Sequence, residues 1–412
     1  MKIVADENIP YVKEAFGCLG DVLTLPGRAM DAAAVKDADV LLVRSITKVD
    51  EHLLEGSSVR FVGTATIGED HIDTAHLANR GIGFASAPGS NANSVGEYVM
   101  AALLVLAERF EFRLAGRTLG IVGVGNVGSR VFEKASEIGM ACVPNDPPLE
   151  RELEKRGLSQ ANEGRRPNER RDCPCFSILG WDNPDFLHPI DDILDCDIVT
   201  LHVPLTREGP DPTCHLADAS FLSEMKPGAI LINTSRGPVA DGDALKLAMD
   251  DGQLSACVLD VWEGEPDVDV GLLERVAIAT PHIAGYSFDG KVNGTRMIYE
   301  AASAFFGIEP TWDPTPLLPA PECPCLDVPG DIEDLERVLR ETVLTVYDVV
   351  RDDCAMRELI AVPANERPAF YDRLRKEYPR RREFFNTRVR VVPRNSRLEQ
   401  QLSGLGFQCE VT

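Results

Sequence analysis

Three residues that follow apolar runs have side chains suited to acid–base chemistry: Arg236 in LINTSRGPVAD, Glu265 in LDVWEGEP and His282 in TPHIAG. Histidine can accept a hydroxyl proton near neutral pH, and a neighbouring carboxylate stabilises the imidazolium that forms. An arginine fork can bind a substrate carboxylate. Taken singly, each residue has a structural explanation as a capping, turn or core residue. Together they indicate proton transfer on a hydroxy acid.

The positions of these residues support that interpretation. Each follows a predicted strand, and open parallel sheets bind ligands beyond the carboxyl ends of their strands. The predicted strands are Ile230–Asn233, Cys257–Asp260 and Val276–Ala279.

A glycine-rich segment, Leu119 to Asp146, carries the pattern of a dinucleotide-binding unit. An apolar strand precedes G-x-G-x-x-G, a helical pattern covers Val127–Ile138, and an acid follows about 20 residues later. The glycines permit a tight turn, a close approach of a pyrophosphate and close helix packing; the pyrophosphate binds at the helix N-terminus. Asp146 favours NAD over NADP, because it accepts from ribose hydroxyls and repels a 2′-phosphate. The expected contacts are Gly123, Gly125, Asn126, Val127, Gly128 and Asp146. The alternative is a degenerate Rossmann unit that binds no cofactor.

Composition excludes several classes of function. The 412 residues suffice for two or three domains. The net charge of −24, from 66 acidic and 42 basic residues, argues against nucleic acid or an anionic membrane as partner. The longest apolar stretch, Tyr98–Ala107, is too short to span a bilayer. The N-terminal residues carry no basic signal region, so we expect a cytoplasmic protein.

The chain contains 11 cysteines, which we expect to be reduced thiols. Two Cys-Pro-Cys pairs, Cys173/Cys175 and Cys323/Cys325, invite a metal-site interpretation. Their one-residue spacing is not typical of a zinc knuckle, and no histidine lies close in sequence. We therefore predict no metal.

Alternating short apolar runs and helical patterns predict an α/β fold with parallel sheets. The predicted domains are residues 1–92 with 290–312, residues 93–289 as a Rossmann-type doubly wound domain, and residues 320–412 as a small α/β module. A charged insertion at about 150–175 is expected to be extended. Long helices are predicted at Asn93–Phe110 and Asn293–Phe306, followed by a proline-rich connector. The tail is predicted to contain helices at Asp331–Val350 and Arg373–Phe385 and a strand at Arg388–Val392.

From Gly123 to Gly285 the succession of G-x-G-x-x-G, N-x-x-R-G, D-V-x-x-x-E-P and P-H-I-A-G resembles the D-isomer-specific 2-hydroxyacid dehydrogenases. The resemblance implies an NAD-dependent enzyme whose substrate domain is flavodoxin-like. It makes His282 the proton donor and acceptor, Glu265 its partner and Arg236 the substrate anchor. The further NAD contacts that it implies are Val203, Thr234, Ser235, Asp260 and Gly285. Val203 stands where the family more often has threonine, and a main-chain contact would survive that change.

Finer motifs resemble one branch of this family: LLVRSITKV, GTATIGEDHID, NDPP, HIAGYS and VYDVVRDD. This branch oxidises the C2 hydroxyl of 4-phospho-D-erythronate during pyridoxal phosphate synthesis and dimerises through its C-terminal module. The resemblance implies substrate contacts from Ser45, Thr66 and Tyr286, with Arg44 as a cation. Turn chemistry is the alternative for Ser45 and Thr66. Phosphoglycerate dehydrogenase, another 2-hydroxyacid dehydrogenase and an NAD-gated corepressor-like protein remain as alternative functions.

Overall fold

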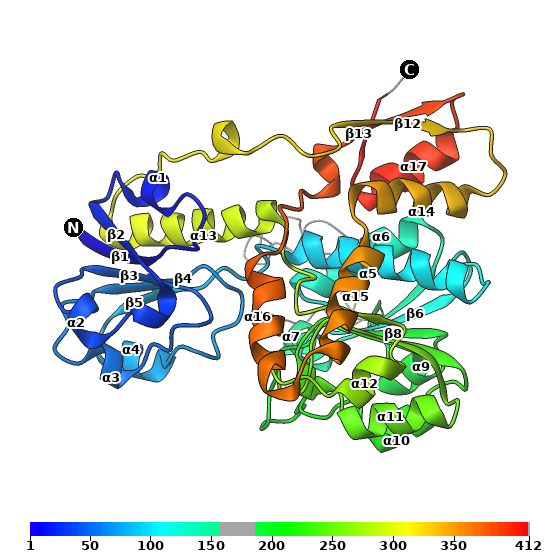
Figure 1. Ribbon diagram of the computed structural model, residues 1–412, viewed down its shortest axis with the longest axis horizontal. Helices are drawn as coiled ribbons and strands as arrows, with labels where there is room; N and C mark the ends of the chain where they lie inside the picture. The colour runs from blue at the N-terminus through cyan, green and yellow to red at the C-terminus, as the bar shows by residue number, and fades with distance from the viewer. Residues whose placement is uncertain (156–185, 411–412) are drawn as a thin grey trace. The chain divides into compact units, whose positions relative to one another are not determined.

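The computed structural model describes residues 1–155 and 186–410, which form two compact units. The first unit contains Met1–Asn93 and Tyr286–Ala320, and the second contains Ser94–Gly285 and Pro321–Thr412 (Figure 1). Contacts group the C-terminal residues with the second unit. That residues 320–412 form a separate domain stays a prediction.

The first unit is built on a five-stranded parallel sheet with the order β2-β1-β3-β4-β5. This order is that of the flavodoxin-like folds, as predicted. The central strands consist almost entirely of buried apolar residues, because helices cover both faces of the sheet. The strands are β1 Lys2–Asp6, β2 Asp21–Leu25, β3 Val40–Val43, β4 Phe61–Thr64 and β5 Gly83–Ala85.

Two groups of helices cover this first sheet. One face packs against α1 and α13, and the other packs against α2, α3 and α4. The long α13 begins where the side chain of Ser287 accepts from the Gly290 N–H. The helices are α1 Val12–Phe16, α2 Ala32–Val35, α3 Glu51–Leu54, α4 Thr74–Asn79 and α13 Phe288–Phe306.

The second unit contains a six-stranded parallel sheet with the order β7-β6-β8-β9-β10-β11. The chain passes from β6 to β7 on one side and then crosses to β8 on the other side of β6. The loops after β6 and β8 therefore diverge, and such a switch point is where doubly wound sheets bind dinucleotides. The strands are β6 Thr118–Val122, β7 Ala141–Asn145, β8 Ile198–Leu201, β9 Ala229–Asn233, β10 Leu254–Leu259 and β11 Ile278–Ala279.

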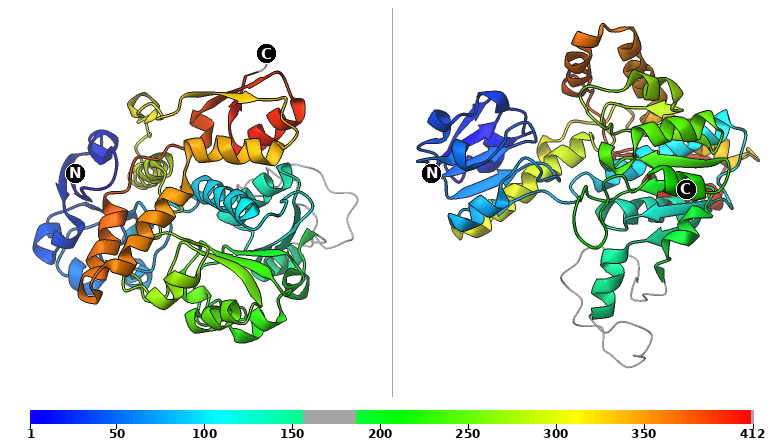
Figure 2. Two further views of the ribbon diagram at one scale, coloured as in Figure 1. Left: turned by 45° about the vertical axis from the view of Figure 1, so that its right-hand side comes forward. Right: turned by 90° about the horizontal axis from the view of Figure 1, so that it is seen from below.

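Helices lie on both faces of this second sheet, as Figures 1 and 2 show. Helices α5 and α6 cover one face, and helices α9 to α12 pack on the other. These helices are α5 Ala92–Arg109, α6 Asn126–Glu137, α9 Ile190–Leu194, α10 Ala219–Glu224, α11 Gly242–Asp250 and α12 Val270–Arg275. None of the helices within residues 1–155 and 186–410 combines the length and apolar character needed to cross a bilayer.

The C-terminal residues form a small α/β module, as predicted. Its three parallel strands have the order β12-β13-β14, and α17 packs against α6. Buried apolar residues of α15 and α16 join the core of the Rossmann sheet. The elements are β12 Cys325–Pro329, α14 Leu335–Val346, α15 Val349–Arg357, α16 Arg367–Lys376, β13 Arg388–Val392, α17 Ser396–Leu405 and β14 Gln408–Cys409.

The prediction of an extended insertion was wrong at its start, because helix α7 covers Pro147–Lys155. Asp146 accepts from the Leu149 N–H at 3.0 Å, and prolines at the first positions of a helix lose no hydrogen bond. Leu153 is buried and anchors the helix. Residues 156–175, the rest of the predicted insertion, lie outside the described residues.

The predicted long tail helix is also wrong, since it divides into α14 and α15 at Tyr347–Asp348. The side chain of Asp348 accepts from the N–H groups of Val350 and Arg351, which starts a new helix. The helix predicted at Arg373–Phe385 begins six residues earlier, at Arg367 with Pro368 in its first turn, and ends at Lys376. Strand β13 has the predicted bounds.

The described cysteines are all free thiols. Within the part of the chain that the structure describes, no three histidine, cysteine or acidic side chains gather as metal ligands. Cys173 and Cys175 lie outside that part.

Candidate functional site

The three fingerprint glycines occupy the positions that cofactor binding requires. Gly123 has a φ of +87°, and a Cβ there would meet the His202 carbonyl at 2.7 Å. A Cβ on Gly128 would lie 2.0 Å from the Gly123 carbonyl oxygen, so helix and strand pack too closely for a side chain. A Cβ on Gly125 would meet nothing within 4 Å. The backbone at Gly125 is thus open to a ligand, while its neighbours close the turn.

The N-terminus of α6 and the end of β7 complete the cofactor cradle, of which the glycine loop Gly123–Gly128 is the first part. Gly125 caps α6 without a side-chain hydrogen bond, and Gly125 and Asn126 are exposed. Asp146 follows β7, and one of its oxygens accepts from the Val124 N–H at 2.9 Å. The acid therefore lies against the glycine loop, as the ribose-binding position of a dinucleotide fold requires. The open backbone and this carboxylate fit NAD.

His282 and Glu265 are hydrogen-bonded partners. The imidazole Nδ1 lies 2.5 Å from Glu265 Oε1. Burial raises the pKa of Glu265, but the hydrogen bonds from His282 and Tyr371 and the charge of Arg375 outweigh it, so that the pKa lies below its ordinary value. Glu265 is therefore ionised at neutral pH. The His282 side chain is 31% exposed, so its imidazole is accessible from solvent.

Asp260 lies beneath the loop that carries His282 and is 1% exposed. Its oxygens accept from the Ile283 N–H at 2.7 Å and the Ala284 N–H at 3.0 Å. The Thr280 hydroxyl donates to it at 2.6 Å. His282 itself has a φ of +57°, a left-handed conformation that a non-glycine residue keeps only when its surroundings impose it. Asp260 helps to impose that conformation; whether it also contacts NAD stays a prediction.

Arg236 lies in the loop after β9, half-buried, and its guanidinium donates to the Ser235 carbonyl at 2.8 Å. A Cβ on the next residue, Gly237, would lie 2.1 Å from the carbonyl carbon and oxygen of Trp262. The arginine loop and the loop that carries Glu265 therefore touch through their backbones. The hydroxyl of Ser235 donates to Asn233, which fixes the turn before Arg236.

The loop after β8 contributes a histidine, His202, that is not among the residues predicted from the sequence. His202 lies within hydrogen-bonding distance of Thr234, Nδ1 to Oγ1 at 3.2 Å, and of Thr200, Nε2 to Oγ1 at 2.9 Å. Burial lowers the pKa of His202 to about 3, so the ring is neutral. Together with Val203, which borders Gly123, it joins the β8 loop to the glycine loop and to Thr234.

A C-terminal residue also reaches the His282–Glu265 pair. The Tyr371 hydroxyl on α16 donates to Glu265 Oε2 at 2.9 Å. The Trp262 N–H donates to the same oxygen at 3.2 Å. No sequence pattern points to Tyr371, because 106 residues separate it from its partner and no motif surrounds it.

The predicted substrate contacts lie in the first unit, at the carboxyl edge of its sheet. Half-buried Arg44 and exposed Ser45 follow β3, and Thr66 follows the neighbouring strand β4. Thr66 Oγ1 lies 2.7 Å from the Thr64 hydroxyl. The ends of two adjacent strands thus bring two hydroxyls and a cation to one edge, although the turn interpretation also accounts for the Thr66 contacts.

Tyr286 lies in the same unit, two residues before the start of α13. The ammonium of Lys291, on α13, lies 4.4 Å from the centre of the Tyr286 ring. Lys291 is a further cation near a predicted substrate residue and is not among the residues predicted from the sequence.

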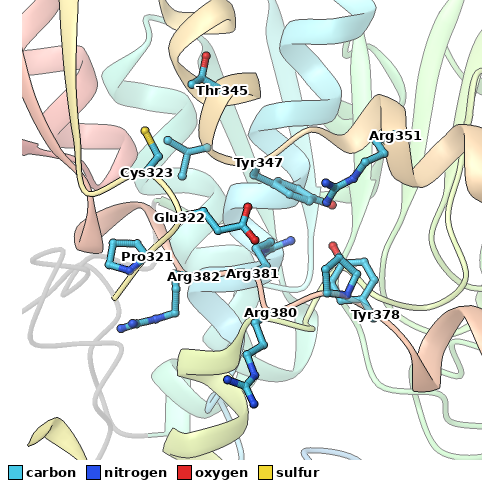
Figure 3. A pocket seen from close by; sticks show the side chains of 12 residues that line it. Pro321, Glu322, Cys323, Thr345, Tyr347, Arg351, Tyr378, Arg380, Arg381 and Arg382 are labelled. Carbon is cyan, nitrogen blue, oxygen red and sulfur yellow. The ribbon is translucent and has the colours of Figure 1, made fainter. Parts of the chain in front are cut away.

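A hollow in the C-terminal module is strongly basic (Figure 3). Arg381 lies across the face of Tyr347, its guanidinium carbon 4.0 Å from the ring centre. The same guanidinium donates to the Ser94 carbonyl at 2.7 Å and so ties the module to α5. The lining includes Arg351, Tyr378, Arg380 and Arg382.

Next to Arg381, a charged cluster is buried between the C-terminal module and helices α5 and α6. Burial, followed by the charge of Glu383, raises the pKa of Glu97 to about 8, although Lys134 and Arg381 oppose the shift. Glu97 accepts from the Phe384 N–H at 2.8 Å. The Lys134 ammonium donates to the Leu405 carbonyl. Ionised and polar groups therefore hold the module on the sheet.

We expect Glu97→Gln to raise the melting temperature relative to the unmutated protein at pH 9 and to leave it nearly unchanged at pH 5. The carboxyl titrates near its ordinary value of 4.5 in the unfolded chain and near 8 in the folded protein. The folded state binds the extra proton in that interval, so stability falls as pH rises through it. Thermal melts at both pH values measure the effect. The same pH dependence in both proteins would contradict the assigned titration.

Similar proteins identify the class of enzyme that has this fold and site. Residues 186–284, which carry Arg236, Glu265 and His282, match the family described as "D-isomer specific 2-hydroxyacid dehydrogenase, NAD binding domain". Residues 317–406 match a "Domain of unknown function (DUF3410)". The D-lactate dehydrogenase of Aquifex aeolicus, solved with NAD and lactic acid, is similar with a TM-score of 0.56 and 25% identity, over 74% of this chain and 96% of that one.

Two relatives indicate the family, within this class of dehydrogenases, to which the chain belongs. An erythronate-4-phosphate dehydrogenase of Citrobacter koseri is 44% identical over 93% of this chain and 92% of its own. Another, of Klebsiella pneumoniae, is 45% identical over 99% of this chain and 98% of its own. The chain belongs to the erythronate-4-phosphate dehydrogenases, a family within the D-isomer-specific 2-hydroxyacid dehydrogenases.

Proposed function

We propose that this protein oxidises the C2 hydroxyl of 4-phospho-D-erythronate to (R)-3-hydroxy-2-oxo-4-phosphooxybutanoate with NAD, in pyridoxal 5′-phosphate biosynthesis. The observation that carries the proposal is the His282–Glu265 pair, whose Nδ1–Oε1 distance is 2.5 Å. A base with an ionised partner is the machinery that removal of a hydroxyl proton needs. Relatives of nearly the full length, named erythronate-4-phosphate dehydrogenases, support the substrate.

In the proposed reaction, His282 takes the hydroxyl proton at Nε2, the nitrogen that does not face Glu265. The ionised Glu265 holds the imidazole in one orientation and stabilises the positive charge that develops on it. Arg236 binds the C1 carboxylate through its planar fork, which places the C2 hydroxyl at the imidazole. Bound NAD supplies the hydride acceptor.

The cofactor contacts follow from the cradle. Gly125 and the first N–H groups of α6, at Asn126 and Val127, bind the pyrophosphate, while Gly123 and Gly128 shape the turn. Asp146 accepts from the adenosine ribose. The nicotinamide side of the site is assigned to the loops after β8, β9 and β10 and to the histidine loop, with contacts from Val203, Thr234, Ser235, Asp260 and Gly285.

The phosphate end of the substrate is assigned to the first unit. Hydroxyls and a cation bind a phosphate through charge-assisted hydrogen bonds. The donors are Ser45 and Thr66, which follow adjacent strands, together with Arg44 and Tyr286. Because the net charge of the chain is −24, an anionic substrate depends on such local donors.

The remaining assignments concern assembly and location. We propose a homodimer formed through residues 320–412, acting in the cytoplasm without nucleic acid or membrane partners. The alternative of a phosphoglycerate dehydrogenase is not favoured, since the relatives that match along nearly the whole chain carry a different name.

We expect purified protein to reduce NAD with 4-phospho-D-erythronate and to use D-3-phosphoglycerate at least tenfold less efficiently by kcat/KM. The longer substrate has an additional hydroxyl and places its phosphate one carbon further from the reacting C2. A substrate that lacks the C3 hydroxyl loses the contacts of that group, and a tenfold loss of kcat/KM corresponds to about 1.4 kcal/mol. Absorbance at the NADH band, with both substrates side by side, measures the ratio. Greater efficiency with 3-phosphoglycerate would overturn the substrate assignment.

A further inference from the structure

The C-terminal module is hydrogen-bonded to the segment that carries His282, on both of its sides. Residues that precede His282 form hydrogen bonds with side chains of α15. Ala284, which follows His282, accepts a hydrogen bond from Arg381. These hydrogen bonds are Arg357 to the Val276 carbonyl at 2.7 Å, the Ala279 N–H to Asp353 at 2.8 Å, and Arg381 to the Ala284 carbonyl at 3.3 Å. The module therefore helps to hold the loop in which His282 has its positive φ.

One side chain of the module reaches further, to the catalytic carboxylate. Glu265 lies between two rings: its Oε1 is hydrogen-bonded to the imidazole of His282, and its Oε2 is hydrogen-bonded to the phenol of Tyr371. Tyr371 is fully buried. Burial, and then the charge of Glu265, raises its pKa well above the ordinary value. The phenol thus stays protonated and can only donate to the carboxylate.

We propose that Tyr371 is a positioning residue of this enzyme, through which the C-terminal module orients Glu265 and sets how strongly it attracts the Nδ1 proton of His282. This inference rests on the proposed dehydrogenase function. The phenol fixes the carboxylate through Oε2, the oxygen that is not bonded to the imidazole. Each hydrogen bond that a carboxylate accepts also lowers its basicity. Removing the phenol therefore loosens the carboxylate and strengthens its attraction for the imidazolium proton.

The other charged or titratable groups that act on Glu265 and Tyr371 come from three elements. Arg375 on α16 lowers the pKa of Glu265 by its charge. Asp260, at the end of β10, raises the pKa of Tyr371. His282 comes from the loop after β11. None of these groups changes in a Tyr371→Phe variant, so a change in pH dependence reports on the phenol.

The test compares Tyr371→Phe with Tyr378→Phe. Tyr378 is a matched control, because its hydroxyl also donates to a carboxylate of the same module, Asp352 at 2.8 Å, but not to Glu265. We expect Tyr371→Phe to lower kcat with 4-phospho-D-erythronate about tenfold, since small displacements of catalytic groups are costly. The KM for NAD should stay within about twofold, because the Tyr371 hydroxyl donates to Glu265, which is not a proposed NAD contact.

The acid limb of the kcat/KM profile distinguishes positioning from a merely structural role. A more basic carboxylate holds His282 protonated to higher pH, so the limb should move upward in Tyr371→Phe by roughly half a pH unit. It should not move in Tyr378→Phe. A second variant with 3-fluorotyrosine at position 371 keeps the hydroxyl in place. Its more acidic phenol should move the limb in the opposite direction. Unchanged limbs in both position-371 variants would overturn the proposal.

A readout without substrate separates this inference from the function on which it rests. In ¹⁵N-histidine-labelled protein, the resonance assigned to His282 by its loss in His282→Asn should shift in Tyr371→Phe and not in Tyr378→Phe. If the unmutated protein does not oxidise 4-phospho-D-erythronate, the proposed function fails while this shift still tests the Tyr371 coupling. An unshifted His282 resonance refutes the coupling even when the enzyme is active.

Discussion

His282→Asn is expected to lower kcat for 4-phospho-D-erythronate by about 10²- to 10⁴-fold, the usual contribution of a general base. Asparagine adopts left-handed backbone conformations more readily than most residues, so the loop with its φ of +57° at position 282 should keep its shape. The asparagine side chain has no group that accepts a proton near neutral pH. Steady-state kinetics measure the loss, and fluorescence titration should show NAD binding within about threefold of the unmutated protein.

The chain offers a closely matched control for this substitution. His215 also has a positive φ, 53°, and its Nε2 lies 2.8 Å from a glutamate oxygen, that of Glu263. The pair has no place in the proposed mechanism. His215→Asn should therefore keep kcat within about twofold. If His282→Asn retains more than a tenth of the activity, His282 is not the base.

Gly128→Ala is expected to destabilise the protein by about 1–3 kcal/mol or more, the usual cost of overpacking, and to abolish measurable NAD binding. The added Cβ would lie 2.0 Å from the Gly123 carbonyl oxygen. Helix α6 then has to move away from β6, and the turn between them, which forms the cradle, opens. Chemical denaturation and NAD titration measure the two effects.

Gly125→Ala separates binding from folding. A Cβ there would meet nothing within 4 Å, although the backbone at φ −73° and ψ −148° lies outside the regions that alanine prefers. Stability should fall by about 1 kcal/mol, the cost of one sparsely populated backbone conformation, so that the protein stays folded. The methyl group fills the space through which the pyrophosphate approaches the backbone, so NAD affinity should fall about tenfold or more, at least 1.4 kcal/mol. Undiminished affinity would exclude Gly125 from the pyrophosphate site.

Local patterns in the sequence were sufficient to predict much of the fold. The buried strand before Gly123 and the amphipathic helix after it are each specified within a few residues, and the structure places them within one or two residues of the prediction. Elements with weaker patterns were missed. Strand β2, Asp21–Leu25, is half-buried at a sheet edge, and its apolar run is short. Helix α17 is recognisable mainly from its packing on α6.

For the site, the sequence by itself determined which residue types stand after which strands. Parallel strands gather their carboxyl ends at one edge, so Arg236, Glu265 and His282 were selected from order alone. Their roles and the substrate contacts remain proposals.

Only the tertiary structure decided how these side chains are held. Asp260 supports the histidine loop from below, Gly237 brings two loops together by backbone contact, and Tyr371 joins Glu265 across 106 residues. Spacing along the chain encodes contacts within one element or turn. A contact between distant segments depends instead on how buried faces pack, and no short pattern records that packing.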